Sequence, residues 1–265
     1  PDQEFKIPPD PLRDAITERT RVFVLNSPGN PTGSTYTPEE IVGLAEAIEE
    51  AARDVTPDLV VVSDEIYEKI VYDGASHMSI GSIGSIAERV VTVNGLSKAY
   101  AMTGWRIGYA AGTGEFGLKV AKAMATLQGQ MSTNITSFVY PAIRTALTQC
   151  GGDVETMRQA FASRAELVHG LITKIPGFVC PKPSGAFYLF PDVSAHFGKS
   201  TPGGKSINSA ASFCDALLDE AKVAFVPGED FGGCGKRCVR ISFACSDEQI
   251  EQGMARLGEF VAALK

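Results

Sequence analysis

Short apolar runs rich in β-branched residues, each followed by a stretch of helical character, constrain the fold of this chain most. The runs are RVFVLN (21–26), LVVVSDE (59–65) and RVVTVNG (89–95). Continuous runs of this kind predict buried strands. Strands that alternate with helices form mostly parallel sheets with helices on both faces. The sequence therefore predicts an α/β fold in which a mostly parallel sheet is sandwiched between helices.

Capping signals mark the starts of two of the predicted helices. Thr37 precedes Pro38, which suits a first helical position, and Glu40 completes a capping box. Ser246 and Gln249 form a second capping box. These signals predict helices that begin beside Thr37 and Ser246.

The segment after the third run contains a glycine motif that needs interpretation. RIGYAAG (106–112) predicts a further strand, and a helix is expected from Glu115 to about Leu127. GTGEFG (112–117) between them matches the dinucleotide pattern G-x-G-x-x-G, but no acidic residue lies between Glu115 and Asp153 to hold a ribose hydroxyl. We interpret the motif as a glycine-rich turn.

The pattern changes in the last third of the chain. A long helical segment over 153–174 is followed by short strands and by helices expected over 206–220 and 246–264. This mixture predicts a small α+β domain. We expect two domains, at residues 1–160 and 161–265.

Composition excludes several classes of partner. The chain has 265 residues with 44% hydrophobic and 21% charged content, as soluble globular proteins do. Its net charge of −7, without a long basic run, argues against nucleic acid and anionic membranes. No apolar run approaches the roughly 20 residues that span a bilayer, and the segment PDQEFKIPPDPL does not resemble a signal peptide.

The six cysteines do not suggest a disulfide scaffold in a chain of this size. Cys234 and Cys238 could be half of a metal site, but no second Cys or His pair with ligand spacing accompanies them. We expect free thiols, no metal and a cytoplasmic location.

Polar side chains gather where the predicted strands end. Asn30 follows the first run, Asp64 ends the second with Tyr67 three residues on, Lys98 follows the third, and Arg106 begins the next strand. Each alone has a structural explanation, such as a helix cap, a turn or a surface ion pair. Open α/β sheets bind ligands at the carboxyl ends of their strands, so together they predict a binding site.

Pyridoxal 5′-phosphate is a cofactor that needs this set of groups. Its aldehyde reacts with a lysine amine, and small apolar neighbours would lower the pKa of Lys98. A carboxylate such as Asp64 keeps the pyridine nitrogen protonated. Tyr67 and Asn30 can donate to the ring's phenolic oxygen, and the fork of Arg106 suits a phosphate.

The motifs carry a resemblance to a known family. They are NSPGNPTG (26–33), SDEIYEKIVYDG (63–74), GLSKAYAMTGWRIGYAAG (95–112) and VRISFACSDEQI (239–250). In this order they resemble class I aminotransferases of the fold-type-I pyridoxal phosphate superfamily, most closely the bacterial aspartate aminotransferase subgroup. The likeness covers essentially the whole chain.

The resemblance implies a role for each residue of the set. Lys98 forms the imine with the cofactor and then moves the proton between the substrate Cα and the cofactor. Asp64 pairs with the pyridinium, Tyr67 and Asn30 bind the 3′-oxygen, and Arg106 holds the phosphate. These are the catalytic and cofactor-binding residues that we expect.

Further residues follow from the same resemblance. Arg240 would bind the substrate α-carboxylate, with Asn30 and Phe187 also near the substrate. Ser97 is a candidate phosphate contact, whereas Gly95 stands where family members often carry a serine. The three histidines match no catalytic position and are interpreted as structural (His77, His169, His196).

Family members carry a sizeable portion before the equivalent of Phe5, including a glycine-rich phosphate loop and residues that read the substrate side chain. We expect this portion to be missing here, which would expose a sheet edge and apolar surface and leave the chain poorly soluble or inactive by itself. The resemblance also implies a homodimer.

The implied activity is ping-pong transamination between an amino acid, expected to be aspartate, and a 2-oxo acid, expected to be 2-oxoglutarate. Other specificities (aromatic, alanine or prephenate) or a lyase reaction on the same fold remain alternatives. A non-catalytic, aminotransferase-like regulatory domain is a third interpretation, against which Lys98, Asp64, Arg106 and Arg240 all argue.

Overall fold

The computed structural model describes residues 4–72 and 74–265. Its contacts define two compact units. The sheet unit comprises Lys6–Pro28 and Thr35–Arg158, and the C-terminal unit comprises Gly29–Ser34 and Gln159–Lys265 together with Glu4 and Phe5. The bounds 1–160 and 161–265 stay a prediction of domain organisation, and each unit is described here by itself.

The sheet unit is built on four strands in the order β1-β2-β3-β4. They are β1 (Val22–Asn26), β2 (Val60–Asp64), β3 (Val90–Gly95) and β4 (Gly108–Gly112). The first three run parallel and β4 is antiparallel to β3, which confirms the mostly parallel sheet. Asp64 pairs with Asn26 on one side and Val93 on the other, so these strands end at a common edge.

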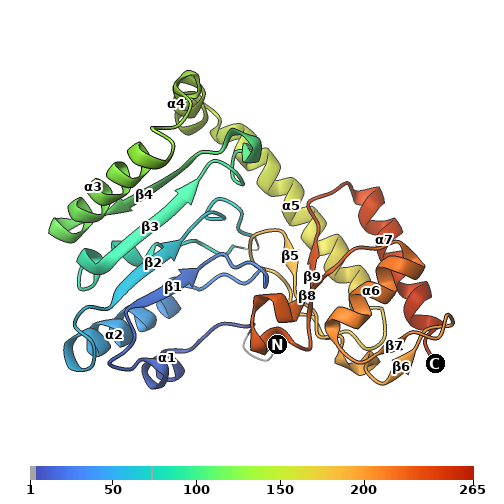
Figure 1. The fold of residues 1–265 in the computed structure, drawn as a ribbon. Coiled ribbons are helices and arrows are strands. Elements are labelled where there is room, and N and C mark those ends of the chain that lie inside the picture. Colours follow the sequence, from blue (N-terminus) through green and yellow to red (C-terminus); the bar gives the residue numbers. More distant parts are fainter. Residues whose placement is uncertain (1–3, 73) are drawn as a thin grey trace. The chain divides into compact units, whose positions relative to one another are not determined.

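Helices flank this sheet, as predicted (Figure 1). Helix α2 (Pro38–Asp54) begins at Thr37 with the predicted capping box and packs against α1 (Pro9–Ala15). Apolar side chains of both helices, of the strands and of the short helices η1 (Ile80–Ser82) and η2 (Ala87–Arg89) form one core cluster. The unit also contains η3 (Thr103–Trp105), α3 (Gly114–Met131), η4 (Ser137–Val139) and α4 (Tyr140–Gln149).

The expectation that the first strand is buried was wrong. Val22 and Val24 are 53% and 62% exposed. They share one face of β1 because side chains alternate along a strand, and β1 lies at an edge of the sheet. Since both side chains stay largely exposed, this apolar run is buried on one side only.

The expected strand over 106–112 begins later, at Gly108, so Arg106 lies before the strand rather than in it. The reason is that η3 ends on Arg106 in the left-handed conformation, with φ 58°. The glycine-rich turn after β4 agrees with its interpretation. A Cβ on Gly117 would lie 2.3 Å from the carbonyl carbon of Gly112, so close backbone packing accounts for this glycine.

The C-terminal unit is a small α+β arrangement. Its three-stranded sheet has the order β5-β9-β8, and all pairs are antiparallel. The elements are β5 (Tyr188–Leu189), η5 (Ser194–His196), β6 (Lys199–Ser200), β7 (Ser206–Ile207), α6 (Ala210–Ala221), β8 (Val226–Pro227), η6 (Gly228–Phe231), η7 (Gly233–Gly235), β9 (Val239–Ser242) and α7 (Asp247–Ala262). Helix α5 (Gly151–Ile172) contains the boundary between the units.

The helix expected over 206–220 starts at Ala210 instead. Ser206 and Ile207 pair with β6, and Ser209 then caps the helix by accepting from the Ser212 amide. The capping box of Ser246 and Gln249 forms as predicted at the start of α7.

All six cysteines are free, as expected. Burial raises the pKa of Cys180 and Cys214 to about 12 and that of Cys238 to about 11. These thiols are therefore protonated near neutral pH and poor nucleophiles. Over the residues that the structure describes, no helix is long and apolar enough to span a membrane.

Candidate active site

Asp64 lies at the carboxyl edge of the sheet unit, at the end of β2. Its Oδ1 accepts a hydrogen bond from the Ile66 amide at 3.2 Å, and its carbonyl accepts one from Asn26 Nδ2 at 3.2 Å. The carboxylate is half-buried, on the strand face opposite Ser63 and Glu65. Tyr67, three residues on, is 3% exposed. Asp64 and Tyr67 therefore lie on an ordered backbone segment, formed by the end of β2 and the turn after it.

The loop between β3 and β4 carries the other predicted residues of this unit. Ser97 and Lys98 are half-buried and Arg106 is exposed. Thr103 Oγ1 donates to the Ser97 carbonyl at 2.8 Å, and Arg106 Nη1 donates to the Thr103 carbonyl at 2.8 Å. The Ala101 amide donates to the Lys98 carbonyl at 3.1 Å. These bonds connect the lysine segment to the arginine within one loop.

Gly95 begins this loop and is paired with Gly108 across β3 and β4. A Cβ on Gly95 would lie 2.7 Å from the Ile107 carbonyl oxygen and 3.3 Å from the Gly108 Cα. The close approach of the two strands explains why the chain has glycine here.

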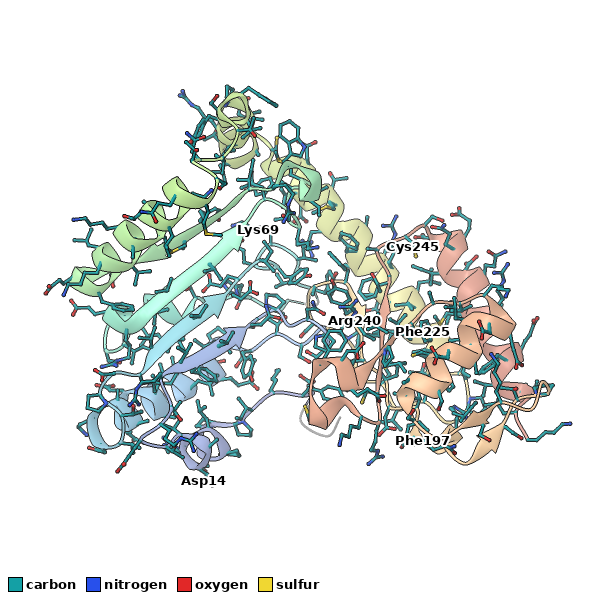
Figure 2. The ribbon with its side chains drawn as sticks, in the orientation of Figure 1. Asp14, Lys69, Phe197, Phe225, Arg240 and Cys245 are labelled. Atoms are coloured by element: carbon teal, nitrogen blue, oxygen red, sulfur yellow. The ribbon has the colours of Figure 1, made fainter. Side chains whose placement is uncertain are left out.

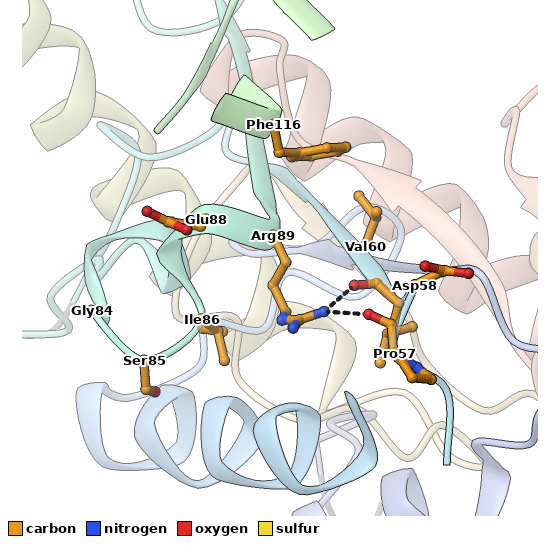
Figure 3. Close-up of a pocket in the computed structure, with 10 residues that line it drawn as sticks. Pro57, Asp58, Val60, Gly84, Ser85, Ile86, Glu88, Arg89 and Phe116 are labelled. Atoms are coloured by element: carbon orange, nitrogen blue, oxygen red, sulfur yellow. Dashed lines mark hydrogen bonds between the residues drawn. The ribbon is translucent and has the colours of Figure 1, made fainter. Parts of the chain in front are cut away.

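Arg106 also lines an open cavity of about 690 Å³, together with Trp105, Ser132, Asn134 and Phe138. A second cavity of about 550 Å³ lies at the opposite edge of the sheet, where β2 and β3 begin (Figure 3). There Arg89 Nη1 donates to the carbonyls of Pro57 at 3.2 Å and Leu59 at 2.7 Å. Arg89 thus bonds backbone oxygens and is not part of the predicted set.

The C-terminal unit holds Arg240 in β9 (labelled in Figure 2). Its Nη1 donates to Asn30 Oδ1 at 3.0 Å. Its guanidinium carbon lies 4.9 Å from the ring centroids of both Tyr188 and Phe231. Among the described residues, the buried Nε has no hydrogen-bond partner. Arg240 is therefore oriented by two rings and one amide, with donor capacity left over for an anion.

Phe187 is 8% exposed, and its ring stacks on Phe161 with centroids 5.2 Å apart. It also contacts Tyr188, at a centroid distance of 4.8 Å. Phe187 thus supports one of the two rings that contact Arg240. Its predicted place beside a substrate stays a prediction.

The structure brings the predicted residues together in two groups. Asp64, Tyr67, Ser97, Lys98 and Arg106 belong to the sheet unit, whereas Asn30, Phe187 and Arg240 belong to the C-terminal unit. Sequence reasoning missed Tyr188 and Phe231, whose rings contact Arg240. Phe231 ends η6, nine residues before Arg240, and no local pattern indicates such a contact.

The donor set of the sheet unit fits pyridoxal phosphate chemically. An amine, a carboxylate, a phenol and a guanidinium match the cofactor's aldehyde, pyridine nitrogen, phenolic oxygen and phosphate (Lys98, Asp64, Tyr67 and Arg106). Asp64 Oδ1 accepts a hydrogen bond from a backbone amide, which orients this carboxylate at the end of β2.

Comparison with known proteins identifies the family. The model of the family "Aminotransferase class I and II" matches residues 1–257. The aspartate aminotransferase of Bacillus subtilis (strain 168) is 42% identical over 261 residues, which are 98% of this chain and 62% of that protein. An aspartate/prephenate aminotransferase of Cereibacter sphaeroides is 40% identical over 98% of this chain and 62% of its own length.

Solved structures agree with this match. The aspartate aminotransferase of Rhizobium meliloti has a TM-score of 0.91 at 36% identity, covering 100% of this chain and 64% of that one. The aromatic aminotransferase of Pyrococcus horikoshii OT3 has a TM-score of 0.87 at 35% identity, over 98% and 65% of the two chains.

The matched family is one of transaminases that generally use pyridoxal phosphate. The chain belongs to this family, the class I and II aminotransferases. It spans about 62% of the length of the curated relatives that it matches.

Proposed function

We propose that the protein binds pyridoxal phosphate and transfers the amino group of an amino acid, with aspartate as preferred donor, to a 2-oxo acid such as 2-oxoglutarate. The observation that carries this proposal is the placement of Asp64, Tyr67, Lys98 and Arg106 around the carboxyl edge of one sheet. The relatives' names support the choice of aspartate, because those with about 40% identity are named aspartate or aspartate/prephenate aminotransferases.

Each residue of the sheet unit has a distinct task in this proposal. The cofactor, when bound, supplies an electron sink that stabilises negative charge at the substrate Cα. Asp64 accepts a hydrogen bond from the ring nitrogen and keeps it protonated. Tyr67 donates to the phenolic oxygen, and Arg106 binds the phosphate with Ser97 as a further contact. Lys98 Nζ would hold the cofactor through its aldehyde, and as a free amine it would take and return the proton at the substrate Cα.

In the C-terminal unit, Arg240 binds the substrate carboxylate through its remaining N–H donors. Asn30 holds one edge of the guanidinium, and the rings of Tyr188 and Phe231 hold its plane. Such a fixed fork recognises a planar carboxylate with two parallel hydrogen bonds. Arg240 therefore selects for compounds that carry such a carboxylate, as α-amino and 2-oxo acids do.

A homodimer and a cytoplasmic location belong to the same proposal. Aminotransferases are commonly dimeric, and size-exclusion chromatography with light scattering tests the dimer. The six unpaired cysteines favour a reducing compartment.

The first experiment is reduction with borohydride in the presence of pyridoxal phosphate, followed by mass spectrometry of the labelled peptide. Label on Lys98, with a visible absorbance band that changes when aspartate is added, is the expected result. A bound cofactor that responds to another amino acid but not to aspartate would change the substrate. A protein that is not labelled at Lys98 would refute the proposal and favour a non-catalytic binding domain.

A further inference from the structure

Glu65, the residue after Asp64, is a buried carboxylate that the proposed mechanism does not use. It is 4% exposed and lies on the core side of β2 with Val61 and Ser63. Asp64 lies on the other, half-buried face. The backbone of two consecutive residues thus carries carboxylates in opposite directions, and carboxylates are almost never fully buried unless paired.

Hydrogen bonds reach Glu65 from three side chains. Its Oε1 accepts from Ser63 Oγ at 2.8 Å and from Ser79 Oγ at 2.5 Å. Its Oε2 lies 3.1 Å from His77 Nε2. Burial alone would raise the pKa of Glu65, but the bonds from His77, Ser79 and Ser63 outweigh it and lower the pKa. Because an ionised carboxylate only accepts, His77 Nε2 carries the hydrogen in this contact.

The same contacts join two points of the chain on either side of Tyr67. Ser63 and Glu65 are at the end of β2, whereas His77 and Ser79 lie just before η1. The Glu68 amide donates to the Glu65 carbonyl at 3.0 Å and the Ile70 amide to the Tyr67 carbonyl at 2.8 Å, so the turn between them is itself ordered. Glu65 therefore closes a loop that contains Tyr67 and starts next to Asp64.

Other charged groups near this cluster do not replace these bonds. Glu68 lies close enough to Glu65 and His77 for their ligand atoms to fall within 4.8 Å of one another, but it pairs with Lys69 at 3.7 Å. Tyr109 of β4 faces both Glu65 and Glu68, and its pKa is raised by burial and by their charges. Glu65 already uses both oxygens on protein donors, so the cluster is a satisfied network.

We propose that Glu65, with His77 and Ser79, is a positioning site that fixes the Asp64 carboxylate and the Tyr67 hydroxyl for contact with the cofactor ring. A buried carboxylate whose hydrogen bonds are all satisfied holds its partners in one arrangement. The Asp64 carboxylate and the buried Tyr67 side chain both belong to this single turn. The inference rests on the proposed function, since it assigns the network a role toward the same cofactor.

The test compares cofactor binding in variants of the protein as it is naturally produced. Glu65→Gln removes the charge at nearly constant size, and His77→Leu removes the donor. We expect both to release pyridoxal phosphate about tenfold more readily, as befits a lost hydrogen bond to a charged group, and to shift the pH midpoint of its visible absorbance. His77→Gln keeps an N–H at similar reach and is expected to restore both properties.

Glu68→Gln is the matched control because it changes an acid in the same turn whose carboxylate pairs with Lys69 and not with Glu65. It is expected to leave the affinity and the midpoint unchanged. If Glu65→Gln does not fold, Ser79→Ala removes one bond to the same Oε1 and is expected to change both properties in the same direction by a smaller amount.

Unchanged affinity and midpoint in Glu65→Gln and His77→Leu would overturn the positioning role while leaving the proposed function intact. Equal losses in Glu65→Gln and Glu68→Gln would also overturn it, since they would indicate a general effect of acidic groups in the turn. If the unsubstituted protein binds no pyridoxal phosphate, the proposed function itself fails, so the two failures are distinguishable.

Discussion

The guanidinium carbon of Arg240 and the ring centroid of Phe231 are 4.9 Å apart, and Tyr188 lies at the same distance. The arginine thus contacts two aromatic rings within the C-terminal unit. Phe231 in turn meets Phe190 edge-on, with centroids 6.1 Å apart. A cation held in this way keeps its plane fixed without losing its N–H donors.

Replacing Phe231 with Leu is expected to weaken substrate binding. A cation–π contact contributes about 0.5–2 kcal/mol, depending on its exposure, so we expect KM for the amino acid to rise roughly 2- to 30-fold with a smaller change in kcat. Steady-state kinetics on Phe231→Leu and Phe231→Tyr measure this. The tyrosine variant retains a ring and should behave as the unsubstituted protein does, and equal effects of both would contradict a role for the ring.

Asn30 orients Arg240 from the side, through the 3.0 Å bond to Nη1. Asn30→Ala is expected to raise KM for the amino acid about tenfold, because a hydrogen bond to a charged group is lost. Asn30→Asp should raise it further, since the new carboxylate would compete with that of the substrate for the same guanidinium. An Asp variant that binds substrate better than the Ala variant would argue against this orientation of the fork.

Much of the sheet unit follows from sequence because its signals are local. The β-branched runs, the Thr37 capping box and the mostly parallel order all agree with the structure. The exposure of Val22 and Val24 does not follow, because a run of valines looks the same whether one face or both are covered.

In the candidate site, too, local sequence indicates some residues, whereas other contacts depend on the tertiary fold. Asp64, Tyr67 and Lys98 can be proposed from sequence because they lie at or just after the ends of strands that the sequence reveals. The network of Glu65 and His77 and the contact of Phe231 with Arg240 could not, because each joins residues whose approach depends on the tertiary fold. His77 was interpreted as structural, and its bond to a buried carboxylate was not foreseen.

Gly95→Ala is expected to destabilise the protein. The new Cβ would approach the Ile107 carbonyl oxygen to 2.7 Å, and backbone on both strands would have to move. Overpacking of this kind costs about 1–3 kcal/mol. Denaturant unfolding measures the difference in the free energy of unfolding.

A matched glycine change should act in the opposite direction. Gly129 lies inside α3, and a methyl group added there would meet no described atom within 4 Å beyond the backbone of its own helix. Gly129→Ala is expected to stabilise by about 0.5–1 kcal/mol because alanine loses less backbone entropy in a helix. Equal destabilisation by both substitutions would contradict the steric explanation for Gly95.

His196 makes stability depend on pH. It is 1% exposed and contacts the rings of Phe178 and Phe213, and its two ring nitrogens find no hydrogen-bond partner among the described residues. Burial, and to a lesser degree the charge of Lys199, lowers its pKa. The unfolded chain therefore binds a proton near pH ~6.5 that the folded protein binds only at lower pH.

The free energy of unfolding should accordingly fall as the pH drops below about 6.5, by at most about 1.4 kcal/mol per pH unit from this group. His196→Phe removes the titrating group from an aromatic environment and should flatten that dependence. Thermal melts between about pH 8 and pH 5 compare the two proteins across this range. The same slope in both would show that other groups cause the acid sensitivity.

The exposed apolar side chains of the sheet unit predict self-association of the 265-residue chain by itself. Leu118, Leu127, Met131 and Phe138 are 74%, 58%, 83% and 77% exposed. Exposed apolar side chains in this number promote aggregation when nothing covers them. Light scattering of the unsubstituted chain should detect oligomers, and the Leu118→Lys, Met131→Lys double variant should form fewer of them. An unsubstituted chain that is a monodisperse monomer would contradict the prediction.

The loop that carries Lys98 and Arg106 leaves the sheet at Gly95 and returns at Gly108, which are paired with each other. The two ends of the loop are therefore fixed by one strand pair, and the loop between them must connect these two positions with its present number of residues. Side chains along it can be exchanged one by one, but an insertion or deletion would move the amine and the guanidinium relative to each other. Natural variation in this loop should thus occur as substitution at constant length.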